Sequence, residues 1–364
     1  MSLEAYFPES LGNKVKVKEK NLEGLIEITK KELARFDGML KHNPLQDTVK
    51  AFLRAEEGFS SASLEFSGLN FEEYIEKLLD KGYGADDLNE FRYIVNLYDQ
   101  MDKMVGEKGF SIDVLNEFQK SLLHNRTSRK HIKEQLIRKR QFWLHDAAKE
   151  KNGFDMRLHA YPDPEKMNNL MDNLDDYIRK SKNDPLITSA IAYGQLVMIH
   201  PWAYANGRTT GALIPFLFNS LGLTRERGFY LSSAFCREKD RYFRKIVQLF
   251  QDGNWDKWVE YFLRKVFSQV ISGQEKIDHL INYCRDLKAT VLKNSFTKEA
   301  LFYVDKMFKR PVFKVTEVER EFQLRYGALF PYIYFMLDAG FLIQDNRKRN
   351  INYVFREVFA LMDL

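Results

Sequence analysis

Apolar residues recur at helical spacing along most of the chain up to residue 290. Leu25, Ile28, Leu33, Phe36 and Leu40 follow one another at intervals of three to five positions, which places them on one face of a helix. Similar stripes occur in NFEEYIEKLLDK, DLNEFRYIVNLYDQM and IDVLNEFQKSLL. The pattern predicts a mainly α-helical fold.

One segment, residues 140–160, departs from the helical spacing. Phe142 and Leu144 precede a charged stretch that ends in Asn152 and Gly153, and apolar residues alternate again beyond it. Asn-Gly between two short alternating runs is typical of a tight β-hairpin turn. We therefore expect a small β-hairpin here.

The pattern changes again near residues 290–295. Residues 295–308, 316–324 and 325–342 have helical spacing, and 341–355 indicates two short strands around a polar turn. Three helices followed by a hairpin is the element order of a winged helix-turn-helix. We expect an N-terminal helical region at 1–110, a helical core at 111–292 and a winged-helix module at 293–364.

Composition excludes several classes of protein. The 364 residues include only two cysteines, Cys236 and Cys284, which are far apart, so neither a disulfide scaffold nor a zinc site is expected. Charged residues interrupt every apolar run before the length that a membrane span needs, and Met1 to Glu19 is too polar for a signal peptide. We expect a soluble, cytoplasmic protein without a membrane partner.

The charge of the chain gives only weak support for nucleic-acid binding. The net charge is +5, and residues 294–364 contain eleven Lys and Arg against nine Asp and Glu. The expected recognition helix has no basic residue between Arg325 and Asp338, and only the wing, Arg347 to Arg349, is plainly basic. Because DNA binding relies on Lys and Arg, this favours a packing or homodimer contact over DNA binding by 293–364.

A second basic run, residues 126–140, contains seven Lys and Arg against one Glu and leads into the expected hairpin. Such a run is most often a solvated helix face. It could instead attract a phosphate-bearing donor or an acidic target segment.

The segment HPWAYANGRTTG starts at His200 and connects two expected helices. The first helix runs from about Asp184 to His200, and the second follows Gly207. Pro201 ends the first helix, and Asn206 and Gly207 place free backbone N–H groups at the start of the second, where the helix dipole favours an anion. Arg208 can donate two hydrogen bonds to phosphate oxygens, and His200 has a side chain whose ordinary pKa suits a general base.

Two interpretations of this turn follow from the residues alone. A histidine beside a proline at a helix end is more often structural than catalytic, and Asn-Gly is a common turn. The alternative is a site for phosphoryl-type transfer, with a phosphate cradle and a base.

The turn resembles the Fic family signature, H-P-F-x-[D/E]-[G/A]-N-G-R-x-x-R. It matches at His200, Pro201, Ala205 and Asn206 to Arg208, with Trp202 in place of Phe. The resemblance extends over most of the chain and implies a Fic-type helical bundle with the hairpin at 140–160 as a target-docking flap. It also implies an inhibitory helix, [S/T]-x-x-x-E-[G/N], at Ser61 and Glu65, with Phe66 in the last place.

The family implies transfer of AMP, or a related phosphate-containing group, from ATP or another nucleotide to a hydroxyl of a target protein. His200 would be the catalytic base. Asn206 and the backbone at Gly207 would hold the transferred phosphate, and Arg208 would steady the outer phosphates. Ala205 would belong to the same nucleotide-binding segment. The target would dock on the flap by strand addition, whose main-chain bonds need no particular target sequence.

Two positions depart from the signature. Tyr204 replaces the acidic residue that holds Mg²⁺, and a phenol is a poor ligand for a hard cation, so the metal would rest on the phosphates alone or be absent. Gly211 replaces the second arginine, which removes a donor for the γ-phosphate and a partner for Glu65. Three functions stay open: an unusual transferase, a catalytically weak nucleotide-binding protein, and a transcription regulator whose core is a scaffold.

Overall fold

The computed structural model describes Leu11, Val15, residues 17–65, 97–106, 110–124, 137–145, 157–294, 298–345 and 347–357, and Leu361. The prediction of a mainly helical fold is confirmed. The N-terminal and central elements are η1 (Glu19–Asn21), α1 (Glu23–Lys41), α2 (Gln46–Glu65), α5 (Ile112–His124), β1 (Trp143–His145), β2 (Arg157–Ala160), η3 (Pro164–Lys166), α7 (Met167–Lys180), α8 (Pro185–Ile199), α9 (Asn206–Ser220), α10 (Ser232–Cys236), α11 (Lys239–Asp252) and α12 (Trp255–Lys293). The C-terminal elements are α13 (Lys298–Phe308), β3 (Val312–Phe313), α14 (Val315–Glu321), α15 (Phe330–Asp338), β4 (Leu342–Gln344) and β5 (Tyr353–Phe355).

Helix α8 lies at the centre of the core and leads into the turn at His200. Asp184 starts the helix because its carboxylate accepts the Leu186 N–H at 2.9 Å, and Pro185 stands at the first position, where no N–H is needed. Almost every residue of α8 is buried, against α7, α9 and α12. The helix is therefore apolar all round, as a central helix must be.

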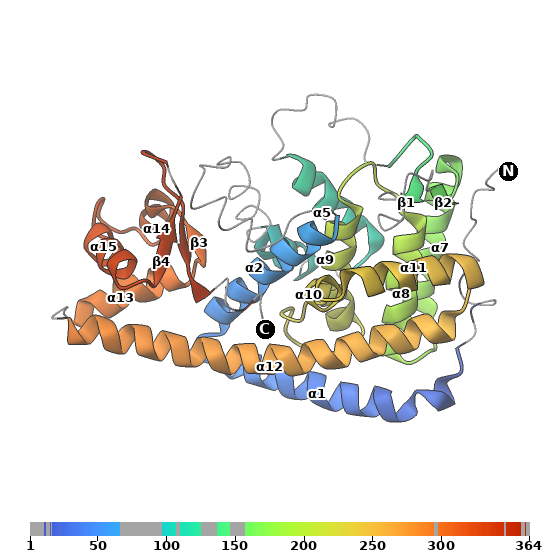
Figure 1. The fold of residues 1–364 in the computed structure, drawn as a ribbon, viewed down its shortest axis with the longest axis horizontal. Coiled ribbons are helices and arrows are strands. Elements are labelled where there is room, and N and C mark those ends of the chain that lie inside the picture. The colour runs from blue at the N-terminus through green and yellow to red at the C-terminus, as the bar shows by residue number, and fades with distance from the viewer. Residues whose placement is uncertain are drawn as a thin grey trace.

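Helix α12 spans the whole width of the molecule and carries the core at one end and the C-terminal elements at the other (Figure 1). Helix α1 packs along it, and α2 crosses the middle of the molecule between these two parts (Figure 1). Helices α1, α2 and α12 thus join segments that are distant in the sequence.

Gly194, on α8, allows α8 and α12 to approach closely. A Cβ at this position would lie 2.6 Å from Nε1 of Trp258 and 3.1 Å from the Trp255 ring. The Trp258 indole also donates a 2.8 Å hydrogen bond to the Ala190 carbonyl, so it cannot move without losing that bond. We expect Gly194→Ala to lower the free energy of unfolding by about 1–3 kcal/mol through overpacking, measured by urea denaturation.

Gly38 provides the control for that substitution. It lies within α1, and nothing stands within 4 Å of a Cβ built there. Gly38→Ala should leave stability unchanged or raise it by up to about 1 kcal/mol, because alanine favours helix. Equal effects of the two substitutions would contradict the packing argument at Gly194.

The expected hairpin is confirmed at its two strands. β1 and β2 are antiparallel, with Trp143 opposite Ala160 and Leu144 opposite His159. The Tyr161 N–H extends the pairing with a 3.0 Å bond to the Phe142 carbonyl. The predicted Asn-Gly turn lies outside the described residues, as do the predicted helix NFEEYIEKLLDK, Phe66 and residues 125–136 of the basic run.

The last elements agree with the predicted order and add one strand. β4 and β5 form the antiparallel hairpin expected in 341–355, and β3 joins the far side of β5 to give the order β3-β5-β4. The predicted third helix begins later than expected, at Phe330. Gly327 has a left-handed φ of 81°, and Pro331 lies in the first turn of α15, so the chain turns before the helix starts.

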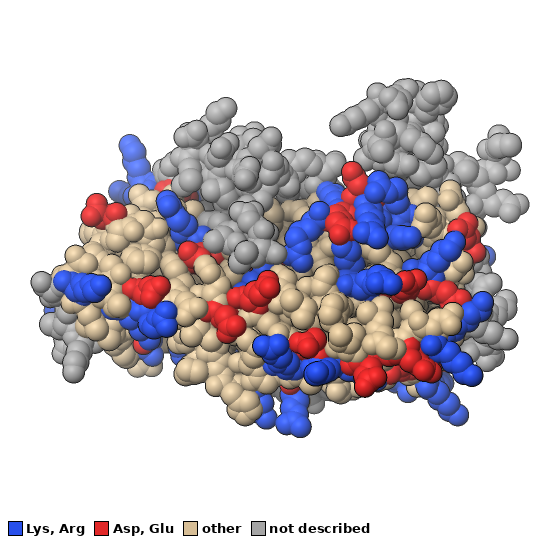
Figure 2. Space-filling view, turned by 60° about the horizontal axis from the view of Figure 1, so that its bottom comes forward, with Lys and Arg blue, Asp and Glu red and all other residues tan. Residues whose placement is uncertain are grey.

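Both cysteines are free thiols. Among the residues that the structure describes, no helix combines the length and apolarity that crossing a membrane would require. Figure 2 shows basic and acidic side chains interspersed over the face that it presents, without a broad field of one sign.

Candidate functional site

The turn between α8 and α9 contains two residues in the left-handed conformation. His200 ends α8 with φ 49° and ψ 58°, and Ala205 precedes α9 with φ 54° and ψ 35°. This conformation costs a non-glycine residue roughly 1–2 kcal/mol, so neighbouring contacts must fix it. They come from inside the turn, from α5 and from residues 137–138.

Asn206 closes the turn from inside. Its Oδ1 accepts the Trp202 N–H at 3.0 Å, and its Nδ2 donates to the Trp202 carbonyl at 2.8 Å. The Trp202 side chain is fully buried. The amide of Asn206 thus closes the turn on itself.

Two polar side chains of α5 hold the turn from outside. Asn116 Oδ1 accepts the indole N–H of Trp202 at 3.0 Å. The buried Gln119 donates to the Tyr204 carbonyl at 2.6 Å and accepts from the Thr209 hydroxyl. These contacts fix the position at which the first N–H groups of α9 are presented.

The imidazole of His200 lies between the two ends of the hairpin. The Tyr161 ring, just after β2, stacks on it at 4.3 Å between centroids, and Phe142, just before β1, meets it edge-on at 6.2 Å. Burial, with a further contribution from the Arg138 cation, lowers the pKa of His200 to about 3. The imidazole is therefore neutral at physiological pH and has a free lone pair for a proton.

The N-terminus of α9 carries the other predicted site residues. Asn206 and Gly207 are the first two residues of the helix, so their N–H groups have no intrahelical acceptor. Arg208 follows in the first turn; its side chain is only 3% exposed and is already in contact with a partner. The structure thus brings His200, Gly207 and Arg208 into one turn, with Arg208 facing inward.

The surroundings of the turn do not suit a resident magnesium ion. Tyr204 is 44% exposed and offers a phenol where a carboxylate would be needed. Within the described ranges, no group of three or more His, Cys, Asp and Glu side chains converges on a common point. We assign no step to a metal.

A carboxyl of α2 lies against Gly211. A Cβ at position 211 would come within 2.5 Å of Glu57 Oε1, 2.8 Å of Ser232 Oγ and 3.5 Å of Ser61 Cβ. Glu57 accepts the Ser232 hydroxyl at 2.6 Å and the Ser232 N–H at 3.2 Å. Glycine at 211 thus allows the Glu57 carboxyl and the Ser232 hydroxyl to lie directly against α9, and any larger side chain would require them to move.

Ser61 and Glu65, the predicted inhibitory residues, also lie on α2. Ser61 is buried beside Gly211, with its hydroxyl on the Gly58 carbonyl at 3.4 Å. Glu65 is the last residue of α2, and its side chain is outside the described part. The carboxyl observed at Gly211 is that of Glu57.

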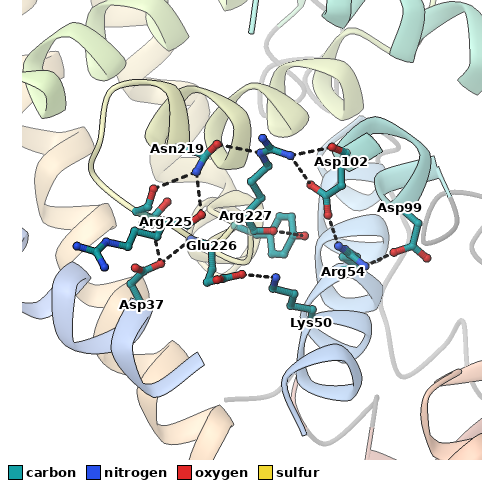
Figure 3. A network of polar contacts seen from close by, with 11 residues as sticks. Asp37, Lys50, Arg54, Asp99, Asp102, Asn219, Arg225, Glu226 and Arg227 are labelled. Carbon is teal, nitrogen blue, oxygen red and sulfur yellow. Dashed lines mark hydrogen bonds and ion pairs between the residues drawn. The ribbon is translucent and has the colours of Figure 1, made fainter. Parts of the chain in front are cut away.

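A network of ion pairs anchors α2 beside the site (Figure 3). The buried guanidinium of Arg54 forks between Asp99 and Asp102, and Arg227 donates to the Asp102 carbonyl at 2.8 Å. Lys50 pairs with Glu226 in the loop after α9. Helix α2 is consequently fixed to residues 97–106 and to the loop that follows the C-terminal end of α9.

Substitution of Glu57 should change how stability depends on pH. Burial raises its pKa from 4.5 to about 8, so the folded protein retains a proton that the unfolded chain loses. The free energy of unfolding should therefore fall between about pH 4.5 and 8, by up to about 1.4 kcal/mol per pH unit. Glu57→Gln resembles the neutral carboxyl and should remove this slope, measured by urea denaturation from pH 5 to 8.5.

Glu260→Gln is the matched control. Glu260 pairs with Arg264 on the surface of α12, so its loss should leave the wild-type slope intact. Parallel pH dependences for wild type and Glu57→Gln would show that Glu57 is not the buried acid responsible.

Sequence reasoning missed Glu57, Arg138, Asn116 and Gln119. Glu57-Gly58 fits the last two places of the inhibitory pattern, but Leu53 stands where that pattern has Ser or Thr. Arg138 was grouped with a basic run, and the amides of α5 gave no signal beyond their place in a helix with an apolar stripe. Only the Glu-Gly pair could have been found from the motif.

Comparison with known proteins finds similarity in sequence and in fold. Residues 110–218 match the Fic/DOC family model. A Fic family protein from Desulfovibrio desulfuricans G20 aligns over 97% of this chain and 98% of its own, with 13% identity and a TM-score of 0.54. This similarity extends the likeness in fold to nearly the whole chain.

Two other solved structures align less closely. Residues 134–508 of Fic-1 from C. elegans align over 72% of this chain and 75% of their own, with 16% identity and a TM-score of 0.49. A Fic domain containing signaling protein from Bacteroides thetaiotaomicron VPI-5482 aligns over 69% and 97%, with 17% identity and a TM-score of 0.49.

Proposed function

From the premise that residues 110–218 form a Fic/DOC family domain, we propose that the protein transfers AMP or a related phosphate-containing group from a nucleotide to a protein hydroxyl. The observation that carries this proposal is the juxtaposition of a neutral imidazole, His200, with the N-terminus of α9. A base and an anion-binding helix end within one turn are the two parts that phosphoryl-type transfer needs.

The step follows from these parts. The donor phosphate binds the N–H groups at Asn206 and Gly207, with Arg208 close by in the same helical turn. The target hydroxyl oxygen forms a bond to phosphorus, the bond from phosphorus to the leaving group breaks, and the hydroxyl proton passes to the His200 imidazole. With ATP as the donor and AMP as the transferred group, the leaving group is pyrophosphate.

The hairpin is proposed as the docking site of the target. β1 starts and β2 finishes beside His200, since Phe142 and Tyr161 both contact its ring. A target strand added to the flap would pass the imidazole, and main-chain hydrogen bonds would hold it without a sequence requirement.

A second function, nucleotide binding with weak or no transfer, is favoured by the packing at Gly211. Glu57 and Ser232 fill the space beside Gly211 where the family signature has an arginine for the outer phosphate. In this role the nucleotide would act as a signal passed to the C-terminal elements.

For the C-terminal part, we propose a winged helix-turn-helix module that acts through protein contacts. Its element order and three-stranded sheet support the module, and its exposed aromatic residues support the protein contact: Tyr326 is 81% and Tyr334 65% exposed. A homodimer contact fits this surface better than DNA, because α15 has no Lys or Arg.

Mass spectrometry of candidate target proteins, incubated with this protein and a panel of nucleotides, tests the transfer. A His200-dependent mass increase on a hydroxyl residue is expected. Calorimetry with ATP, with and without Mg²⁺, separates the alternatives: binding without any transferred group supports the nucleotide-binding function, and absence of both product and binding rejects the two proposals together.

A further inference from the structure

Arg138 lies beneath the site turn with its side chain only 2% exposed. Its guanidinium donates to the carbonyl of His200 at 2.8 Å, of Arg140 at 3.1 Å and of Ile199 at 3.4 Å, and also to that of Pro162. Its backbone N–H donates to the Pro201 carbonyl at 3.0 Å. One residue thus makes five hydrogen bonds to backbone carbonyls.

These carbonyls belong to two parts of the fold, the site turn and the base of the hairpin. Ile199, His200 and Pro201 form the end of α8 and the start of the site turn, whereas Arg140 precedes β1 and Pro162 follows β2. The neighbouring Ile137 adds an antiparallel bridge to Trp202. Arg138 therefore connects the base of the flap to the backbone of His200 through hydrogen bonds.

Arginine suits this position for geometric reasons. Its planar fork presents five N–H donors in fixed directions, and it stays protonated, since burial lowers its pKa only to about 10. Carbonyls at a helix C-terminus carry partial negative charge and attract a cation. In the part of the chain that the structure describes, no carboxylate forms an ion pair with Arg138, and its hydrogen bonds there go to backbone carbonyls.

We propose that Arg138 is a positioning residue, which holds His200 in its left-handed conformation and ties it to the flap, so that a target segment on the flap and the imidazole move as one unit. This inference rests on the proposed function for its catalytic meaning. Its structural content, the coupling of His200 to the flap through Arg138, can be tested without any transfer reaction.

Few charged and titratable groups among the described residues act on His200, and Arg138 is one of them. Arg138 and Tyr161 face His200 directly, Asp163 acts on Arg138, and Tyr242 acts on Tyr161. Arg138 is the one of these that disfavours the imidazolium. Its removal should loosen the turn, admit water to the ring and let His200 take up a proton more readily.

The test uses the full chain with Arg138→Gln and Arg138→Lys, and Arg140→Gln as the matched control. Arg140 is exposed and two residues away, and only its backbone carbonyl contributes to the site. NMR titration of ¹³C-labelled histidine follows His200, assigned by His200→Ala. In Arg138→Gln the midpoint should rise from about 3 towards the ordinary 6.5, whereas Arg140→Gln should match the wild type.

Kinetics supply the second measurement. Arg138→Gln should lower kcat by about 10²-fold with little change in the KM of the donor, because misplacement of a catalytic group affects the chemical step. Arg138→Lys keeps the charge but loses the fork, so it should fall between Arg138→Gln and the wild type.

An unchanged His200 titration in Arg138→Gln would overturn the proposal. If Arg138→Gln does not fold, Arg138→Lys decides: wild-type titration and wild-type kcat in that variant would overturn it equally. Absence of transfer by the wild type would reject the proposed function, while the NMR titration would still decide whether Arg138 positions His200.

Discussion

His200→Ala is expected to lower the rate of group transfer by roughly 10²–10⁴-fold, the contribution of a well-placed general base. The imidazole is the group that can accept the hydroxyl proton beside the α9 N-terminus, and Tyr161 and Phe142 hold its ring in place. The measurement is the initial rate of product formation by mass spectrometry. Binding of the nucleotide should persist, because the N–H groups of α9 do not depend on the imidazole.

The pH profile sharpens this prediction. Because the pKa of His200 is lowered to about 3, the base stays neutral down to about pH 4. The rate should therefore show no loss attributable to His200 between pH 8 and 5, unlike a histidine with an ordinary pKa near 6.5. His42→Ala, at an exposed position after α1, is the control. A transfer rate equal in His200→Ala and His42→Ala would exclude His200 as the base.

Lys276→Met is expected to lower the free energy of unfolding by about 3–5 kcal/mol. Lys276, on α12, forms an ion pair with Glu56 on α2, and their side chains are 0% and 4% exposed. Removal of the lysine leaves a buried carboxylate without its partner. Urea denaturation at constant pH measures the loss.

The double variant Lys276→Met, Glu56→Leu should recover most of that loss, because an apolar pair needs no compensation. Arg264→Met, which breaks the exposed pair with Glu260, should cost less than about 1 kcal/mol. A double variant as unstable as Lys276→Met alone would show that packing, and not the unpaired charge, causes the effect.

This ion pair also bears on the site. Glu56 is adjacent to Glu57, which contacts Ser232 and packs against Gly211. In Lys276→Met, the rate of amide hydrogen exchange in α2 should thus increase more than the rate in α8. The reason is that α2 loses an anchoring ion pair and α8 does not.

Local signals in the sequence were sufficient for the helices and the site turn. Helix α8 follows from a run of small and apolar residues after about Asp184, Asn206 and Gly207 mark the start of α9, and the flap strands follow from alternation. These features depend on neighbouring residues alone, which is why they could be predicted.

Contacts between distant segments could not be predicted in this way. The motif indicates Glu65 as the inhibitory acid, and the side chain of Glu65 lies outside the described residues. Packing of α2 on α9 also brings Glu57 to Gly211, a contact that the motif does not predict. The hydrogen bonds of the Asn206 amide to the Trp202 backbone are a further contact that the motif does not state. A motif records which residue types occur, whereas their partners depend on how helices cross.

The sequence by itself determined a mainly helical chain and a turn with a histidine, a helix N-terminus and two departures, Tyr204 and Gly211. Only the tertiary structure decided which side chains pack against Gly211 and which residues hold the turn. Gly211 is the place where α2 packs closely against α9, and Arg138 binds the flap to His200. The reason is that burial, pKa and hydrogen-bond partners arise from segments that meet only when the chain folds.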